Sequence, residues 1–252
     1  MKRKLPLTEA ASVRYGTHLD PLLITSSKTD VATHQTGAQP IATTQASAAK
    51  ATQNNIPVVR VGDVTAGRAS ARYIGPVPSP PMKFLAKRGD IVVSMSGQFN
   101  INRWADNDAL LDQRVMRVRG LRNSTSTDYL FHCLVPVLKA IEQQTVGHRT
   151  KNLSAKQVKQ ITVDLPAFNQ QKRIAAILDA FKAAVDNFRR QTELRRLQLE
   201  YYRNLIASRT ANPTATPSEN LTTFNNYIAN LDRQTTLRQQ QYEYYRDLLL
   251  FK

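Results

Sequence analysis

The chain has few of the residues that build metal, redox or disulfide sites. Among its 252 residues there is one cysteine, Cys133, so neither an intrachain disulfide nor a metal cluster of several cysteines can form. The four histidines show no zinc-ligand spacing: His18, His34, His132 and His148. We therefore expect no metal and no cofactor.

Long hydrophobic runs are missing as well. No stretch of about 18 apolar residues is present, and the basic start Met1–Lys4 is followed by Leu5–Glu9, which supplies no apolar core for a signal peptide. We expect a cytoplasmic protein that does not bind membranes.

Acidic residues are outnumbered. Lys and Arg total 35 against 19 Asp and Glu, which gives a net charge of +16 and a pI near 10.2. The excess is +11 up to Pro166 and +5 after it. Such an excess points to a polyanionic partner, with nucleic acid as the leading candidate. Many soluble proteins are nevertheless basic without binding nucleic acid, so charge alone does not decide.

Catalytic motifs are absent too. There is no Walker loop, and the acidic residues form no recognisable nuclease cluster. The segment Ser79–Met82 resembles the Pro-Pro signature of amino-methyltransferases, but it lacks the aromatic residue that would stack on a flipped base. No glycine-rich loop follows a strand to hold S-adenosylmethionine. We interpret the segment as a proline-rich turn and predict a binding protein rather than an enzyme.

What the sequence does contain is a repeat. Thirteen of the 27 residues in 181–207 recur, identical and in order, in 224–250, an offset of 43. Apolar or small residues recur in both copies at alternating spacings of four and three, which is typical of a coiled-coil seam. The seam carries Thr and Arg at equivalent places: Thr192 and Arg195, then Thr235 and Arg238. Two copies of one unit predict an antiparallel helix pair with approximate twofold symmetry, whose seam buries these side chains equivalently.

The chain before the repeat has a mixed pattern. Residues 26–55 are rich in Thr, Ala, Gln and Ser and indicate a long loop. Alternation and turn residues predict strands at 56–61, 90–96, 114–119 and 161–165. Helices are predicted at 127–145, at 153–157 with Ser154 as the cap, and at 169–207. The third strand would be half-buried, with arginines on its open face, and Gly97–Asp108 would be a loop.

The order of these elements resembles the specificity subunits of type I restriction-modification systems. The segments that carry the resemblance are Ile56–Val64, Lys87–Ser94, Asn152–Ser154, Ile161–Pro166 and Gln170–Asp179. The last is the most diagnostic, because it is similar to the family's passage from target-recognition domain into conserved helix. Together the segments span about Ile56 to Ile206.

The resemblance implies an α+β fold. A globular target-recognition domain with a β-rich core would occupy 1–167, followed by two long helices that form an antiparallel coiled coil. The boundaries it implies are 168–207 for the first conserved helix, 208–220 for a linker and 221–252 for the second conserved helix.

The resemblance also implies partners. The recognition domain would read half of a split sequence in double-stranded DNA, and the helices would dock methyltransferase (modification) subunits, with the restriction subunit as a further partner. The family's usual chain has two recognition domains, whereas this sequence has one, so we expect a homodimer through the helices. The competing hypothesis is a regulatory or assembly half-subunit that occupies modification subunits without reading DNA.

Candidate contacts follow from residue chemistry, since Asn and Gln pair with adenine and Arg with guanine. The predicted base readers are Gln98, Asn100, Asn102 and Arg103, with Trp104 as an apolar or stacking contact. The predicted phosphate contacts are Arg149 and Lys151 and, more weakly, Arg60, Arg68 and Arg72. Any of these residues could instead be an ordinary solvent-facing one.

A second apolar stripe on the first helix lies off the seam. Its residues are Leu194, Leu197, Tyr201 and Leu205. We predict that this stripe is a partner interface, and the alternative is burial against the chain's own recognition domain.

Overall fold

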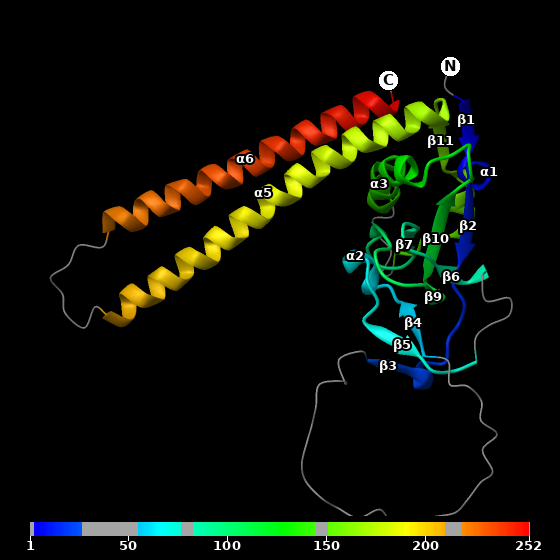
Figure 1. Ribbon diagram of the computed structural model, residues 1–252, viewed down its shortest axis with the longest axis horizontal. Helices are drawn as coiled ribbons and strands as arrows, with labels where there is room; N and C mark the ends of the chain where they lie inside the picture. Colours follow the sequence, from blue (N-terminus) through cyan, green and yellow to red (C-terminus); the bar gives the residue numbers. More distant parts are fainter. Residues whose placement is uncertain (1–2, 27–54, 77–82, 145–150, 210–217, 252) are drawn as a thin grey trace, which may run out of the picture. The chain divides into compact units, whose positions relative to one another are not determined.

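The computed structural model describes residues 3–26, 55–76, 83–144, 151–209 and 218–251. It divides into two compact units, Met1–Phe168 and Asn169–Lys252. The first is rich in β-strands, and we call it the recognition unit after the target-recognition domain predicted for it. The second is a pair of long helices (Figure 1), so the predicted α+β architecture is confirmed. Most of the predicted loop 26–55, the segment Ser79–Met82 and Arg149 lie outside the described residues.

The recognition unit is built on two main sheets. The first has the order β2-β10-β7-β8 with antiparallel neighbours, and its strands are Ala11–Tyr15, Val115–Gly120, Ile91–Ser94 and Ile101–Arg103. The second has the order β3-β5-β4-β9-β6, with strands Ile24–Ser26, Ala71–Tyr73, Ile56–Val59, Ala109–Leu111 and Leu85–Ala86. Within the second sheet β4 and β9 are parallel. All four residues of β7 are buried, as the apolar run of a central strand requires.

The remaining elements close the unit. Strand β1 (Arg3–Pro6) pairs with β11 (Thr162–Leu165), so the first and last strands of the unit lie side by side. The helices are α1 (Leu7–Ala10), η1 (Pro21–Leu23), α2 (Asp63–Ala66), α3 (Thr127–Gln144) and α4 (Ala155–Gln160). The predicted cap is confirmed, because Ser154 accepts a hydrogen bond from the Gln157 amide at 3.2 Å within a capping box.

The segment Gly97–Asp108 is not wholly a loop. Residues 101–103 form β8, which pairs with β7. Trp104 follows β8 with 1% of its surface exposed, and its indole donates to the Asn107 carbonyl at 2.7 Å. The prediction that Trp104 stacks on a base is therefore wrong for this structure, because the ring belongs to the core.

The expected row of exposed arginines on the third strand is also wrong. Strand β10 lies between β2 and β7, so both of its long edges are paired. Arg117 is 4% exposed and donates to the Leu85 carbonyl of the second sheet, and burial lowers its pKa. Arg119 binds the buried Asp90 carboxylate through two nitrogens, a hydrogen bond that raises the pKa of Arg119. Arg117 therefore links the two sheets, whereas Arg119 links β10 to the residue that precedes β7 within the first sheet.

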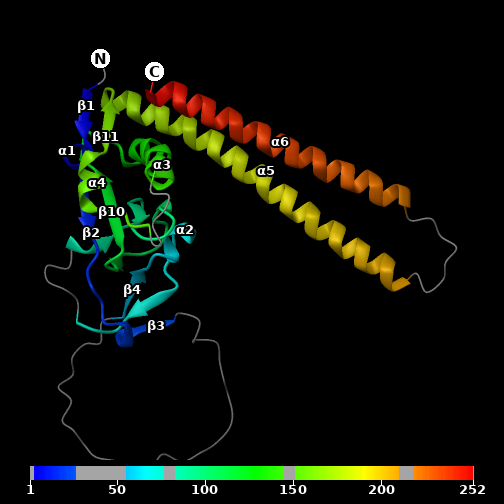
Figure 2. The same cartoon turned by 180° about the vertical axis from the view of Figure 1, so that it is seen from behind.

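The second unit consists of α5 (Phe168–Arg209) and α6 (Ser218–Phe251), which run side by side in Figures 1 and 2. Phe181, early in α5, stacks on Tyr245, late in α6, with ring centroids 5.1 Å apart. The pair is therefore antiparallel, as the repeat predicted. None of the helices in the described part of the chain is long and apolar enough to cross a bilayer.

The seam between α5 and α6 buries apolar side chains, among them Val185, Ile228, Leu231 and Tyr242. Arg195 and Arg238 are exposed at its edge, and each donates to a glutamine three residues on, at 2.9 Å. The expectation that the seam buries these arginines is wrong, because a guanidinium is costly to bury without a carboxylate.

Candidate nucleic-acid interface and partner surface

The turn between β7 and β8 is held by internal hydrogen bonds. The buried Ser94 hydroxyl donates to the Gln98 carbonyl at 2.6 Å and accepts from the Asn100 amide at 2.8 Å. Gly97 supplies a left-handed φ of 75°, and Phe99 is 4% exposed. The Gln98 side chain is exposed, so the turn presents an amide from an ordered backbone.

Two other turns lie beside this one. The Gly97 amide donates to the Lys151 carbonyl at 2.9 Å, and the Leu153 amide donates to the Met95 carbonyl at 2.8 Å. On the other side the Met95 amide donates to the Arg114 carbonyl at 2.8 Å. Three turns therefore meet at one end of the first sheet. We call this surface the three-turn end and define it by residues 96–98, 112–114 and 151–152.

The exposed side chains of the three-turn end belong to the residue types, amides and arginine, that pair with base edges in DNA-binding proteins. They are Gln98, Gln113, Arg114 and Asn152. Lys151 is half-buried, and its ammonium lies 3.6 Å from the Glu142 carboxylate.

A hollow of about 690 Å³ joins the same surface and contains two of the predicted phosphate contacts, Arg60 and Arg68. Arg60 donates to the Ser70 hydroxyl at 2.8 Å and lies 3.6 Å from Asp63. Asp63 is 5% exposed and accepts from the backbone amides of Arg60 and Ser70 at 3.0 and 3.2 Å. Asp112 also lines the hollow and is the first residue of the turn 112–114, so the hollow and the three-turn end are continuous.

Other predicted contacts are engaged within the protein. The Asn102 side chain donates to the Thr65 carbonyl at 2.7 Å and accepts from the Arg103 amide at 2.9 Å. Arg103 lies 3.0 Å from the Asp128 carboxylate and 4.4 Å from the centre of the Phe131 ring. These two side chains fix β8 against α2 and α3.

Arg72 and Asn100 are less exposed than Gln98. Arg72 donates to the Asn55 side chain at 2.5 Å, and Asn100 is half-buried.

Sequence reasoning missed Gln113, Arg114 and Asn152. The first two follow the apolar strand β9 and precede the apolar start of β10, so the polar break Asp112–Arg114 is itself a turn signal. Asn152 had no local signal, because its place beside Ser96 comes from a bridge between distant segments. Among the described residues no cluster of three or more His, Cys, Asp or Glu could hold a metal ion.

The helix pair repeats its contacts with the offset of the sequence repeat. The Thr192 and Thr235 hydroxyls, 43 positions apart, lie 3.4 Å from each other. Arg196 contacts Asp232 at 2.7 Å. Shifting these two positions by 43 in opposite directions gives Gln239 and Arg189, which are hydrogen-bonded at 3.0 Å. An approximate twofold axis therefore passes between the two threonines.

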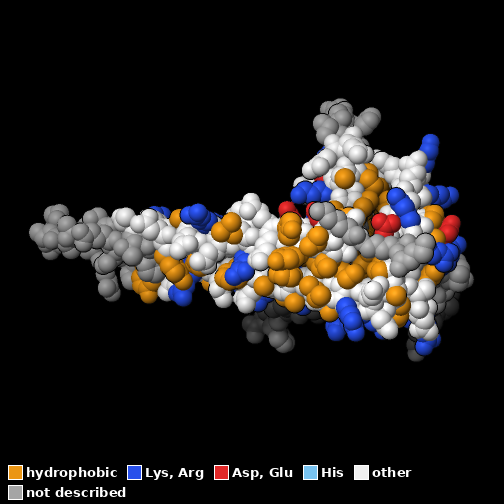
Figure 3. All heavy atoms as spheres, turned by 90° about the horizontal axis from the view of Figure 1, so that it is seen from above, with side chains coloured by type: hydrophobic (Ala, Val, Ile, Leu, Met, Phe, Trp, Pro, Cys, Tyr) orange, Lys and Arg blue, Asp and Glu red, His pale blue; other side chains and the backbone are white. Residues whose placement is uncertain are grey.

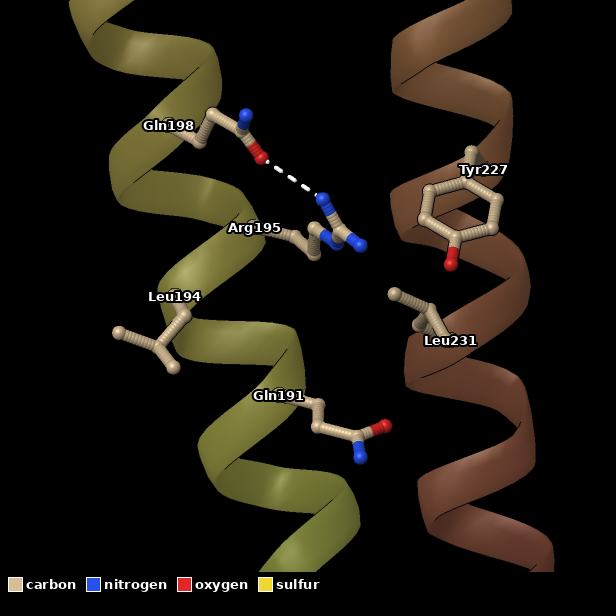
Figure 4. Close-up of a pocket in the computed structure, with 6 residues that line it drawn as sticks. All are labelled: Gln191, Leu194, Arg195, Gln198, Tyr227 and Leu231. Carbon is tan, nitrogen blue, oxygen red and sulfur yellow. Dashed lines mark hydrogen bonds between the residues drawn. The ribbon is translucent and has the colours of Figure 1, made fainter.

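Two hollows on the helices obey the same symmetry. The first, about 390 Å³, is lined by Gln191, Leu194, Arg195, Gln198, Tyr227 and Leu231 (Figure 4). The second, about 500 Å³, is lined by Phe188, Gln234, Leu237, Arg238 and Gln241. The four residues of α5 in the first hollow shift by 43 onto the four residues of α6 in the second. The helix pair thus presents the same kind of site twice.

The apolar stripe on α5 is exposed. Leu194, Leu197 and Tyr201 expose 59%, 54% and 63% of their surface, and the Leu205 side chain lies outside the described residues. The equivalent stripe on α6 exposes Leu237 and Tyr244. Figure 3 shows hydrophobic side chains on the surface of the helices, with lysines and arginines between them.

Comparisons of this chain with known proteins all point to the same family. Residues 27–196 match the model of the type I restriction modification DNA specificity domain. The chain is 30% identical over 141 residues to the type I restriction enzyme EcoBI specificity subunit of Escherichia coli, covering 56% of this chain and 29% of that one. It is 35% identical over 82 residues to the putative type I specificity subunit S.MpnORF289P C-terminus of Mycoplasma pneumoniae, covering 31% and 54%.

Solved structures share the fold. The type I restriction-modification S subunit from M. genitalium superimposes with a TM-score of 0.50 at 17% identity, over 80% of this chain and 44% of that one. A chain from a study of complex assembly and conformational transition of the type I system gives 0.50 at 13% identity, over 96% and 45%. The chain therefore spans less than half of each of these solved chains.

Proposed function

Because this chain belongs to the family of type I restriction modification DNA specificity domains, we propose that it reads one half-site of a split target in double-stranded DNA and docks methyltransferase subunits. The three-turn end carries the first part of the proposal, since it gathers amides and a guanidinium on ordered turns beside the hollow that holds Arg60 and Arg68.

Contacts to phosphates and contacts to bases would come from different residues of this surface. Arg60, Arg68 and Lys151 provide positive charge for phosphates, and Arg149 stands two residues before Lys151 in the chain. Phosphate contacts position a protein on DNA, whereas base edges give the sequence. Gln98 remains the predicted reader with the best support. Asn102 and Arg103 act as positioning residues, because their side chains hold β8.

The two equivalent hollows on α5 and α6 support the docking of two copies of one partner. A twofold axis offers identical surfaces to identical subunits, and exposed apolar side chains of this number mark protein interfaces. We propose methyltransferase subunits as those partners and the restriction subunit as a further one. The chain itself transfers no methyl group, and catalysis belongs to its partners.

A split target has two half-sites, and we propose that a second copy of this chain, joined through the helices, reads the other half-site. The alternative function, an assembly subunit without DNA readout, would need the helical surfaces but not the three-turn end.

The test is DNA binding by the purified chain with its methyltransferase subunits. We expect a sequence-selective complex whose affinity falls steeply with salt. Binding of the methyltransferase subunits together with equal affinity for all DNA sequences would favour the assembly subunit. Methyl transfer by a preparation free of other subunits would contradict the non-catalytic role.

A further inference from the structure

Arg114, immediately before β10, differs from the two arginines of that strand. Arg117 and Arg119 are engaged by the Leu85 carbonyl and the Asp90 carboxylate. Arg114 is exposed on the turn between β9 and β10, and within the described part of the chain its guanidinium forms no hydrogen bond or ion pair. Its backbone is fixed, because its carbonyl accepts from the Met95 amide at 2.8 Å. A free guanidinium on a fixed backbone is prepared for a ligand.

The neighbours of Arg114 indicate which ligand. Gln98 and Asn152 are exposed on the two turns that complete the three-turn end. Amides of this kind pair with the adenine edge through two hydrogen bonds. Cations that could bind phosphates flank these three residues. Arg60 and Arg68 line the hollow that continues from the turn 112–114, and Lys151 lies on the segment that is hydrogen-bonded to Gly97. Positive side chains for the DNA phosphates thus lie on both sides of the side chains that can pair with base edges.

We infer that Arg114 reads a guanine in the half-site, with Gln98 and Asn152 reading adenines beside it. The inference rests on the proposed DNA-reading function and names the residues and bases of that same site. An arginine donates two parallel hydrogen bonds to O6 and N7 of guanine in the major groove. Within the described residues no ion pair of Arg114 has to break first, so binding there loses no stabilising contact of the free protein.

The competing role for Arg114 is a phosphate contact, and the two roles predict different data. A base contact gives sequence preference at one position, whereas a phosphate contact weakens all sequences equally and lowers the salt slope by about 1. The experiment is selection from a random double-stranded DNA library by the full chain with its methyltransferase subunits, followed by titration of the selected site in several salt concentrations.

With Arg114→Ala we expect the selected motif to lose its preference for guanine at one position. Discrimination against the other three bases at that position should fall about 5- to 150-fold. The salt slope should stay close to that of the wild type. Arg114→Lys keeps the charge but lacks the two-pronged geometry, so it should lose the same preference. Arg122→Ala is the matched control, because Arg122 is exposed just past the other end of β10 and should leave the motif unchanged. Unchanged Trp104 fluorescence verifies that each variant is folded.

Three outcomes would overturn the inference. If the wild type selects a motif and Arg114→Ala selects the same motif with a lower salt slope, Arg114 contacts phosphate and only the inference fails. If Arg114→Ala changes neither motif nor slope, the inference fails in the same way. If the wild-type complex selects no motif at all, both the inference and the proposed function fail.

Discussion

The two units of the chain expose opposite chemistry. Twelve large hydrophobic side chains are exposed in the described residues, and ten of them lie on α5 and α6, whereas the recognition unit exposes only Leu22 and Leu121. The recognition unit instead exposes one arginine, Arg114, and several amides at the three-turn end. Protein interfaces are rich in aromatic and apolar groups and DNA interfaces are polar and positive. The contrast fits the proposed function, in which the helices bind protein subunits and the recognition unit binds DNA.

The units also differ in symmetry. Contacts on the helix pair recur with the offset of 43, whereas the sheets of the recognition unit contain no such repeat. A symmetric surface suits two equal partners. An asymmetric one suits a DNA sequence that has a direction, so each unit has the symmetry of its proposed partner.

The largest expected effect is on the free energy of unfolding, which should fall in the recognition unit and stay unchanged in the helix pair. Asp90 is 3% exposed and accepts hydrogen bonds from Arg119 and from the Lys87 amide at 2.7 Å. Asp90→Ala should cost the recognition unit about 3–5 kcal/mol, because it leaves a partly buried cation unpaired. Urea unfolding followed by Trp104 fluorescence should shift, while the helical circular dichroism of α5 and α6 persists.

The control for this experiment is Asp108→Ala, since Asp108 is 53% exposed and lies 3.9 Å from Lys87. That variant should unfold like the wild type. Simultaneous loss of the fluorescence and helical signals in Asp90→Ala would show that the two units unfold together and would break the comparison.

The next effect concerns the two hollows. Leu194→Asp and Leu237→Asp should each weaken one docking site by about 100-fold, because a charge replaces an apolar contact at an interface. Calorimetry with the methyltransferase subunit should then give one tight site in place of two for either variant. Glu193→Gln, exposed beside Leu194, is the control. Unequal losses would mean that the two hollows serve different partners.

Self-association should depend on Leu197, which the repeat does not copy, together with Tyr201 on the same stripe. Leu197 corresponds to Gln240 in the second copy. Changing Leu197 and Tyr201 to Asp should weaken a homodimer by at least about 10-fold, because both side chains point away from the seam. Sedimentation would measure it, with Gln240→Asp as the control. A dimer of unchanged affinity in the double variant would exclude this stripe.

A smaller effect is expected in DNA binding. Arg60→Ala and Arg68→Ala should each reduce the slope of log affinity against log salt by about 0.9 and leave the sequence preference intact. Arg173→Ala, an exposed arginine of α5, should leave the slope unchanged if DNA binding belongs to the recognition unit. If Arg173→Ala reduced the slope equally, DNA would contact the helix pair as well as the recognition unit, and the two units would not differ in this respect.

The smallest effect tests the symmetry of the helix pair. Changing Arg196 to Gln and Asp232 to Arg together would convert the contact Arg196–Asp232 into a copy of the pair Arg189–Gln239. Both positions lie in water, where ion pairs contribute little. Thermal unfolding should therefore be unchanged, and a clear loss of stability would show that the two halves of the pair are not equivalent.

The sequence predicted the helices better than the sheets for a physical reason. Helical periodicity is local, so the repeat sufficed to predict that Phe181 meets the end of α6. The neighbours of a strand are distant in sequence, so the burial of Arg117 and Trp104 depends on partners that no local pattern reveals. The same reason applies to the proposed site, since Gln98 was predicted from its chemistry, whereas the position of Asn152 depends on its bridge to Ser96 beyond strand β7 and had no local signal.

Pairing of β1 with β11 sets a constraint on synthesis. Arg3 aligns with Leu165, so the first strand cannot find its partner until almost all of the recognition unit has been made. At about 5–20 residues per second, the ribosome needs roughly 10–30 s for that length of chain. During this interval β1 is an unpaired strand edge that can join another chain. The nascent protein should therefore associate with a chaperone until residue 165 has left the ribosome and the unit can close.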